Sequence, residues 1–389
     1  MNKNSKTIKQ NFIRENNVKV IIELLAEKPY SCLEISNQTK MSDVGVNKIV
    51  KQLVSLNLVK RVIGDKDEKK IGGQHIRYTL NECVGVYVCI DFTQLIDKAF
   101  IYDFAGNIIK TIKFNITYSV TKQDIENVIL ILREELNKIL CSYNNTILGI
   151  GISVPGQIDK NDNSFIESSK FKNFKNTELY DMFNNEFDTY IIIRNNVQMM
   201  AIGESYKGKL FNQHDIATYV YVGTGIAACV MFEGKNVSGW RGYAGEIGDG
   251  KINPNDTLND CSSMGKILKK VRLTNPNINY SDFYELYRND ESFKETINDS
   301  AKVLAIFLQN ITNLIGCNLF MIDGMALDFG EEYINIIQEH LNQHSSIKVD
   351  VIKSSLENSA MVGAIKLLKD FVIINYYQKQ LALISENDN

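Results

Sequence analysis

The sequence lacks the features that would assign it to a membrane, an export route or a disulfide scaffold. No apolar run approaches the ~20 residues that span a bilayer, and the polar, basic stretch 1–17 has no apolar signal core. The seven cysteines are an odd number, lie scattered between Cys32 and Cys317, and form no CxxC pair. We therefore expect a cytoplasmic protein with no membrane contact, whose cysteines are reduced and mostly buried. No internal repeat is detectable.

Charge is distributed unevenly along the 389 residues. The net charge is −3, yet residues 1–80 carry 15 Lys and Arg against 8 Asp and Glu, and the remainder carries 28 against 38. A basic segment joined to an acidic one favours a polyanionic partner for the basic part, although a solvated basic face would have the same composition. The length and a hydrophobic fraction of 44% allow two or three globular domains with a substantial core.

The N-terminal part of the chain has the pattern of three helices. Apolar residues recur with helical period over 18–27, and serines that can cap a helix begin the stretches 31–39 and 42–56. In the second of these helices, Leu33 and Ile35 are expected to point inward. Two short strands follow, joined by a charged loop. Helix, helix, turn, helix and β-hairpin is the order of a winged helix-turn-helix, whose third helix enters the major groove of DNA.

The third helix and the hairpin supply the expected DNA contacts. Polar residues remain on the open face of the helix, and amide and lysine side chains can reach base edges or phosphates. Basic residues of the hairpin would contact the DNA backbone or the minor groove. A winged helix used only for protein contacts is the alternative. The expected DNA-binding residues are Ser42, Asp43, Gly45, Asn47, Lys48, Lys51, Lys69, Lys70, Gln74, His75 and Arg77.

From residue 84 onward, expected strands and helices are interspersed as in an α/β domain. The tail from Glu386 is expected to be disordered. Strands are expected over 84–92, 97–103, 107–116, 147–154, 190–194, 319–322 and 347–351, and long helices over 122–143 and 293–313.

The stretch 222–249 is the most distinctive part of the body. It opens with Gly223-Thr224-Gly225 after an apolar run, continues through a hairpin turn, and closes on Gly245-Glu246-Ile247-Gly248-Asp249. A Gly-Thr-Gly turn can present N–H groups to an anion, although a tight turn between strands is the simpler interpretation. With Ala-Gly-Glu-Ile-Gly at this distance downstream, the stretch resembles the signature of the ROK family, which comprises repressors, open reading frames and sugar kinases.

The resemblance covers nearly the whole chain and includes the Pro155-Gly156 turn and the closing helix at 360–364. It implies an α/β protein with a winged helix-turn-helix in residues 1–80 and a two-lobed body of the actin/hexokinase (ribonuclease H-like) type in 81–389. The small lobe would span about 84–197 plus the C-terminal helix, and the large lobe about 198–360. The ligand-binding residues implied by the resemblance are Gly156, Asn195, Asn196, Glu246 and Asp249.

The chain departs from the family's kinases at the catalytic positions. Asn196 stands where they have an aspartate that takes the proton from the attacking hydroxyl, and an amide has no basic lone pair for that role. General-base catalysis is worth roughly 10²–10⁴-fold. The turn Asp91-Phe92-Thr93 also lacks the glycine that wraps nucleotide phosphates. We therefore expect a protein that is not an enzyme, has no cofactor and has no catalytic residue.

The family's zinc site is also eroded. The family has a histidine where this chain has Asp249, and its Cys-x-Cys-Gly-x-x-Gly-Cys-x-Glu motif falls on 259–268, where Cys261 is the remaining cysteine. A structural zinc requires about four nitrogen or sulfur ligands. We expect no metal here. The glutamate that ends the motif, another sugar contact of the family, becomes Leu268.

The resemblance implies a transcription regulator, most simply a repressor, whose kinase-like body senses a sugar without phosphorylating it. A homodimer or homotetramer would read a two-fold symmetric DNA operator. Two alternatives remain open. One is a regulator with a degenerate pocket that a protein partner controls, and the other is an active sugar kinase with an additional domain.

Overall fold

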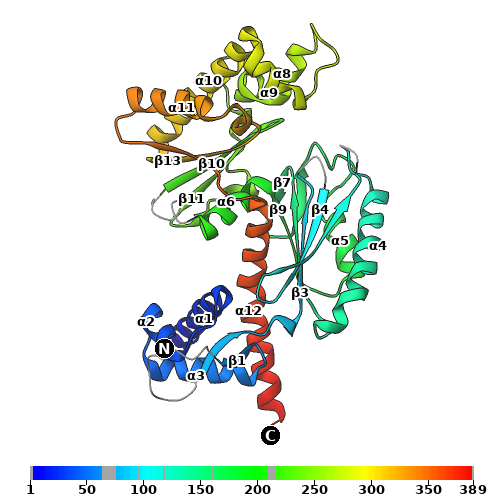
Figure 1. Ribbon diagram of the computed structural model, residues 1–389, viewed down its shortest axis with the longest axis vertical. Coiled ribbons are helices and arrows are strands. Elements are labelled where there is room, and N and C mark those ends of the chain that lie inside the picture. The colour runs from blue at the N-terminus through cyan, green and yellow to red at the C-terminus, as the bar shows by residue number, and fades with distance from the viewer. Residues whose placement is uncertain are drawn as a thin grey trace. The chain divides into compact units, whose positions relative to one another are not determined.

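The computed structural model describes residues 3–63, 76–93, 97–116, 119–159, 161–208 and 216–387. The chain forms two compact units, each containing a five-stranded sheet (Figure 1). The first unit comprises Met1–Ile152, Glu178–Ile192 and Ile365–Asn389, and the second comprises Ser153–Thr177 and Ile193–Ala364.

The N-terminal head of the first unit has the predicted winged helix-turn-helix order. Three helices, α1 (Lys3–Glu27), α2 (Cys32–Thr39) and α3 (Asp43–Ser55), precede the antiparallel strands β1 (Val59–Ile63) and β2 (Ile76–Leu80). The first helix starts well before the periodic stretch from which it was predicted. The loop between the two strands lies outside the described residues.

Local side chains define the helix starts in the head. The Ser31 hydroxyl accepts a hydrogen bond from the Glu34 N–H at 3.2 Å, and the Glu34 carboxylate accepts one from the Ser31 N–H at 2.7 Å, which completes a capping box. Ile35 is buried as predicted, but Leu33 is 62% exposed, so its prediction was wrong. Residues two apart on a helix are separated by roughly 200° and cannot share a face.

The five-stranded sheet of the first unit has the strand order β5-β4-β3-β6-β9. Figure 1 shows α4 and α5 on one side of this sheet and the C-terminal helix α12 on the other. On the α12 side, the position of a Cβ on Gly149 would lie 3.0 Å from the Leu368 side chain. The elements are β3 (Val86–Asp91), β4 (Asp97–Asp103), β5 (Ile108–Phe114), α4 (Lys122–Ile139), β6 (Ile147–Val154), α5 (Glu178–Glu186), β9 (Ile191–Asn195) and α12 (Ser359–Asn387).

The sheet of the second unit has the order β12-β11-β10-β13-β14, in which β10 is antiparallel to β11 and parallel to β13. One core cluster joins this sheet to the helices that follow it, and β7 and β8 form a separate pair. The elements are β7 (Gln157–Asp159), β8 (Ser164–Glu167), α6 (Asn196–Lys207), β10 (Ile216–Val222), β11 (Ile226–Phe232), β12 (Lys235–Asn236), α7 (Leu258–Ser262), α8 (Met264–Val271), α9 (Phe283–Asn289), α10 (Glu291–Ile315), β13 (Leu319–Gly324), α11 (Glu331–His344) and β14 (Asp350–Lys353).

Helix α12 begins against α6 within the second unit. A Cβ on Gly363 would lie 1.9 Å from the Met199 carbonyl oxygen, and one on Gly203 would lie 2.1 Å from the Ser359 carbonyl oxygen. Glycine at both positions lets the two backbones approach. The helix continues to Asn387, so the prediction of a disordered tail was wrong for Glu386 and Asn387, and the rest of that tail lies outside the described residues.

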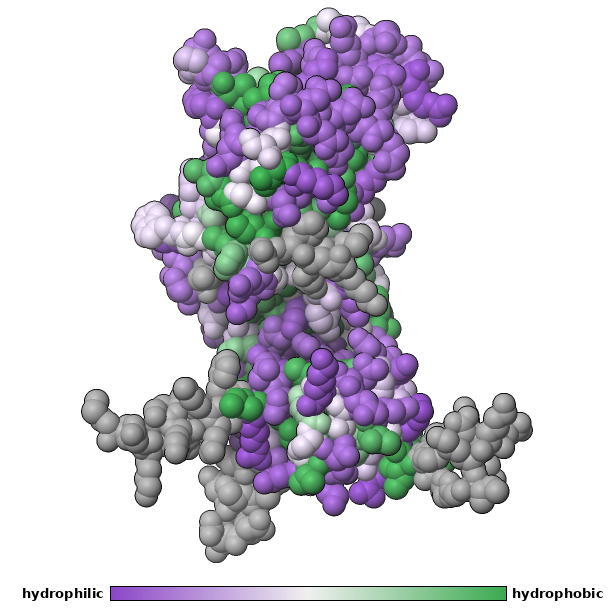
Figure 2. Space-filling view, turned by 90° about the vertical axis from the view of Figure 1, so that its left-hand side faces the viewer, coloured by the Kyte–Doolittle hydropathy of each residue, from purple (hydrophilic) through white to green (hydrophobic). Residues whose placement is uncertain are grey.

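The burial of the cysteines differs from the expectation from composition. All seven cysteines are free thiols, but only Cys89, Cys229 and Cys317 are buried, while Cys83 and Cys141 are exposed, so the expectation of mostly buried cysteines was wrong. On the face in Figure 2, hydrophilic and hydrophobic residues are interspersed. Among the described residues, no helix is both long enough and apolar enough to cross a bilayer.

Candidate functional site

Helix α3 has the burial pattern that a DNA-reading helix requires. Val46, Ile49, Val50 and Leu53 are buried in the head, whereas Asn47, Lys48 and Lys51 are exposed. The Ser42 hydroxyl accepts a hydrogen bond from the Gly45 N–H at 3.2 Å and caps the helix. The exposed Asp43 lies in the first turn, where a carboxylate complements the helix dipole.

The structure shows an exposed apolar residue on α3 and an ion pair at a predicted DNA contact. Val44 on α3 is 80% exposed, and sequence periodicity assigned it no role. An apolar side chain at this position suits contact with a thymine methyl group. Arg77 is engaged within the head, where its guanidinium lies 2.7 Å from the Glu34 carboxylate. The predicted contacts Lys69, Lys70, Gln74 and His75 lie outside the described residues.

All five predicted ligand-binding residues belong to the second unit, and two of them bond directly. The Asn195 amide donates to the Gly156 carbonyl at 2.8 Å and accepts from the Gln198 N–H at 3.1 Å, so it also caps α6. Gly156 has φ +121°, and a Cβ there would lie 2.4 Å from the Glu167 carbonyl oxygen. Asn195 thus holds a turn that requires glycine, with both ends of its amide engaged.

Asn196 follows as the first residue of α6 and is buried. Its side-chain amide forms no hydrogen bond with the residues that the structure describes. An amide beside the Asn195 cap can both donate to and accept from a ligand hydroxyl. It cannot take a proton near neutral pH, because protonation of an amide requires strong acid.

Among the predicted ligand-binding residues, Glu246 has a shifted pKa. It is partly buried, and burial, followed by the nearby carboxylates of Asp249 and Glu167, raises its pKa to about 7. Glu167 ends β8, beside the Gly156 turn. Sequence reasoning missed Glu167, since no local motif marks it. The fold therefore brings the Gly156 turn, Glu167, Glu246 and Asp249 into one neighbourhood of the second unit.

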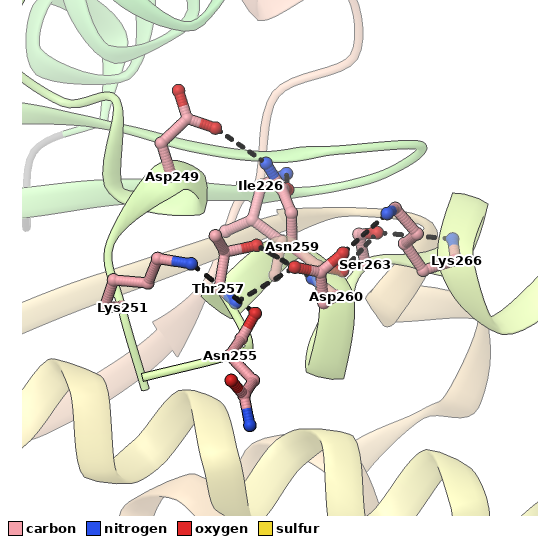
Figure 3. A network of polar contacts seen from close by, with 9 residues as sticks. All are labelled: Ile226, Asp249, Lys251, Asn255, Thr257, Asn259, Asp260, Ser263 and Lys266. Carbon is pink, nitrogen blue, oxygen red and sulfur yellow. Dashed lines mark hydrogen bonds and ion pairs between the residues drawn. The ribbon is translucent and has the colours of Figure 1, made fainter. Parts of the chain in front are cut away.

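Asp249 takes part in a network of polar contacts (Figure 3). Its carboxylate accepts a hydrogen bond from the Asn259 amide at 3.4 Å, and the Asp260 carboxylate lies 2.5 Å from the Lys266 ammonium. Of the residues at the family's zinc positions, Asp249 and Asn259 thus bond each other, Lys266 pairs with the neighbouring Asp260, and Cys261 offers the one thiol. Within the described part of the chain, no cluster of three or more histidine, cysteine or carboxylate residues has metal-binding geometry. These residues do not fit a structural zinc.

Two further turns, after β3 and at the end of β13, carry aspartates that are bonded locally. The Asp91 carboxylate accepts hydrogen bonds from the N–H and the hydroxyl of Thr93, and Phe92 is fully buried. Asp323, at the end of β13, accepts a hydrogen bond from the Tyr219 hydroxyl and one from the Gly324 N–H. Both carboxylates are therefore bonded within the protein.

Comparison with known proteins places these features in context. The sequence profile of the ROK family matches residues 87–371. A xylose repressor of Caldicellulosiruptor bescii is 24% identical over 91% of this chain and 95% of its own length. A xylose repressor of Bacillus subtilis strain 168 is 22% identical over 93% and 97%. An N-acetylmannosamine kinase of Haemophilus influenzae is 21% identical over 64% of this chain and 86% of its own.

The similar solved structures also include both a regulator and a sugar kinase. The ROK family transcriptional regulator described as a homolog of the E. coli MLC protein superposes with a TM-score of 0.77 at 15% identity, covering 95% of this chain and 98% of that one. The ROK hexokinase of Thermus thermophilus superposes with a TM-score of 0.60 at 15% identity, covering 73% and 99%. The regulator therefore matches more of this chain than the hexokinase does. On the profile match, which spans most of the body, this chain belongs to the ROK family.

Proposed function

We propose that this protein is a transcription repressor that binds operator DNA through α3 and responds to a sugar-like effector that it does not phosphorylate. The proposal depends on the presence of two parts in one chain. One is a winged-helix head whose helix α3 exposes a polar face, and the other is a ROK body with Asn196 at the proton-acceptor position. The xylose repressors of Caldicellulosiruptor bescii and Bacillus subtilis match 91% and 93% of the chain, which makes xylose the first effector to test.

The absence of catalysis is supported by chemistry at three positions. Asn196 has an amide where a base is required, and the loss of general-base catalysis costs about 10²–10⁴-fold. The Asp91 and Asp323 carboxylates are hydrogen-bonded to Thr93 and Tyr219, which reduces their availability to a nucleotide or its metal ion. Sensing requires hydroxyl recognition alone, and Asn196 and Glu246 retain the groups for it.

Helix α12 supports a route from the effector to the head. In the second unit it starts against α6, the helix that Asn195 and Asn196 begin. In the first unit the Lys366 ammonium of α12 lies 2.7 Å from the Glu23 carboxylate on α1, and the Tyr377 hydroxyl donates to Gln52 on α3 at 2.7 Å. A shift of α6 on effector binding would therefore reach the DNA-reading helix through one continuous element.

The same proposal covers the assembly and its location. A homodimer or homotetramer would present two α3 helices to a two-fold symmetric operator in the cytoplasm. Effector binding would release DNA only if the effector prefers the conformation that does not bind DNA.

A regulator controlled by a protein partner is the second candidate, and one observation favours it. Leu268, at the position of a sugar-contacting glutamate of the family, is 5% exposed and lies in the core of the second unit. The apolar leucine side chain cannot hydrogen-bond a sugar hydroxyl, so the ligand site lacks one polar contact that the resemblance implies.

A DNA-binding titration tests the proposal. The probe is a labelled duplex selected from a random pool by the purified protein, and xylose, glucose and N-acetylmannosamine are added in turn. Lys48→Ala and Lys51→Ala should each weaken binding and reduce the slope of log affinity against log salt by about 0.9. Lys269→Ala, which removes an exposed lysine of α8, is the matched control.

Three outcomes discriminate between the candidates. Unchanged affinity and slope in both α3 variants would refute DNA reading by this helix. Wild-type protein that binds DNA but none of the sugars would favour control by a partner. Sugar-dependent release of ADP from ATP would establish the kinase alternative.

A further inference from the structure

We propose that Asn259 is the positioning residue that fastens the turn at 246–249 to the turn at 223–226, and that it does so in place of a metal ion. The proposal rests on the proposed function in one respect: it takes Glu246 and Asp249 as effector contacts. The fastening itself follows from contacts within the second unit.

Asn259 bonds to both turns with one side chain. Its amide oxygen accepts a hydrogen bond from the Ile226 N–H at 2.8 Å, and its amide nitrogen donates to the Asp249 carboxylate at 3.4 Å (Figure 3). The fit is close, because a Cβ on Gly248 would lie 2.5 Å from the amide nitrogen and 2.6 Å from the amide oxygen of Asn259. The Ile226 carbonyl oxygen would lie nearer still, at 2.3 Å, so glycine at 248 lets the turn approach both the Ile226 backbone and the Asn259 side chain.

The backbone around Asn259 is anchored in both directions. The Leu258 N–H donates to the Gly250 carbonyl at 2.8 Å, which ties α7 to the residue that follows the turn at 246–249. The Met264 N–H donates to the Gly223 carbonyl at 2.9 Å, which ties the start of α8 to the turn at 223–226. The backbone of Asn259 is therefore held in place, and its side-chain amide bridges the turns at 223–226 and 246–249.

The helix that carries Asn259 has its own polar support. Asp260 forms a capping box with Thr257, and the Lys266 ammonium pairs with the Asp260 carboxylate at 2.5 Å. The Asn259 carbonyl accepts from the Ser263 hydroxyl at 2.7 Å. These contacts hold α7 without any metal ligand.

The positions involved correspond to those of the family's zinc ligands. In the alignment of motifs, Asn259 and Lys266 occupy two cysteine positions and Asp249 occupies the histidine position. The residue at one former ligand position now bonds the residue at another. A neutral amide that donates to a carboxylate makes a direct tie, whereas zinc would need thiolates that this chain lacks.

Thermal unfolding with and without EDTA tests the inference on the full-length protein. The wild type should hold no stoichiometric zinc, and EDTA should leave its Tm unchanged. Asn259→Ala should lower Tm by about 3–8 °C, because the Ile226 N–H and the Asp249 carboxylate lose their partner. Asn335→Ala, at an exposed position on α11, should change Tm by less than about 1 °C.

A rescue experiment separates positioning from general loss of packing. The variant Asp249→His/Asn259→Cys/Lys266→Cys, together with Cys261, restores one histidine and three cysteines. It should take up one zinc per chain and recover the Tm lost in Asn259→Ala, and EDTA should remove that gain. If Asn259→Ala does not fold, the Tm of the zinc-loaded variant with and without EDTA serves as the test.

Any one of three results would overturn the inference: one zinc per wild-type chain, a Tm of Asn259→Ala equal to that of Asn335→Ala, or a triple variant that binds no zinc. None of these measurements contains a sugar. A protein that binds no effector would refute the proposed sensing and leave the role of Asn259 intact.

Discussion

Two glutamates of the second unit differ in what surrounds them. Glu204 on α6 is fully buried, and its carboxylate accepts hydrogen bonds from the Ser354 hydroxyl at 2.7 Å and from the Ser355 and Leu356 N–H groups at 3.0 Å. Glu246 is only partly buried, and among the described residues none donates a hydrogen bond to its carboxylate. Its pKa is raised to about 7.

The comparison shows that hydrogen-bond partners, rather than burial alone, separate a structural carboxylate from one available to a ligand. Donors around Glu204 replace the water that burial removed, and they tie α6 to the segment just before α12. Glu246 has lost part of its hydration without receiving donors. Ligand hydroxyls would supply the missing hydrogen bonds, and this is why Glu246, and not Glu204, is the candidate contact.

The largest expected effect is on stability at Glu204. Glu204→Ala leaves the Ser354 hydroxyl and two backbone N–H groups without their acceptor in a buried site, and should lower the free energy of unfolding by about 3–5 kcal/mol. Glu204→Gln retains an acceptor oxygen and should cost about 1–2 kcal/mol. Urea unfolding measures both. Losses below 1 kcal/mol for Glu204→Ala would remove the distinction between the two glutamates.

The second effect is on effector binding at Glu246. Glu246→Ala should weaken binding of the responsive sugar, xylose in the first instance, by about 10–100-fold, since a partly buried carboxyl group that can bond a hydroxyl is lost. Operator affinity without sugar should stay at the wild-type value. Calorimetry and DNA titration measure the two quantities. Equal sugar affinity in wild type and variant would show that Glu246 does not contact the ligand.

The smallest effect is on the pH dependence of stability. The pKa of Glu246 in the folded protein, about 7, lies above its ordinary value of 4.5, so the folded state binds more protons than the unfolded state between these values. The free energy of unfolding should therefore decrease as pH rises from about 4.5 to about 7 through this group. Glu246→Gln removes this contribution. Urea unfolding at pH 5 and pH 7.5 should show a smaller decrease in the variant, and an identical decrease would contradict the environment described for Glu246.

Local signals made much of the fold predictable. Ser31 and Ser42 cap helices where the sequence predicts caps, because an N-cap hydroxyl acts on the next turn of the same segment. Strands β3, β4 and β5 lie within the predicted stretches for the same reason, since alternation and turn residues act over a few positions. The prediction for Leu33 failed because Leu33 and Ile35 lie roughly 200° apart around the helix, so only one of them can face the core.

The candidate site was predictable only in part. Its motif residues, Gly156, Asn195 and Glu246, could be named because they stand at set places in recognisable runs. Glu167 could not, since it approaches Glu246 through the β7–β8 pair and no local pattern records that approach. The contacts of α12 with Glu23 and Gln52 were equally invisible, because they join opposite ends of the chain.

The sequence by itself determined the order of helices and strands in the head, the family, and the chemistry missing at Asn196 and at the zinc positions. Each of these depends on residue identity within a short window. Only the tertiary structure decided which carboxylates receive hydrogen bonds, that Val44 on α3 is exposed, and how Asn259 joins two turns. Those properties depend on the distances between segments far apart in the chain, which packing sets and local pattern does not.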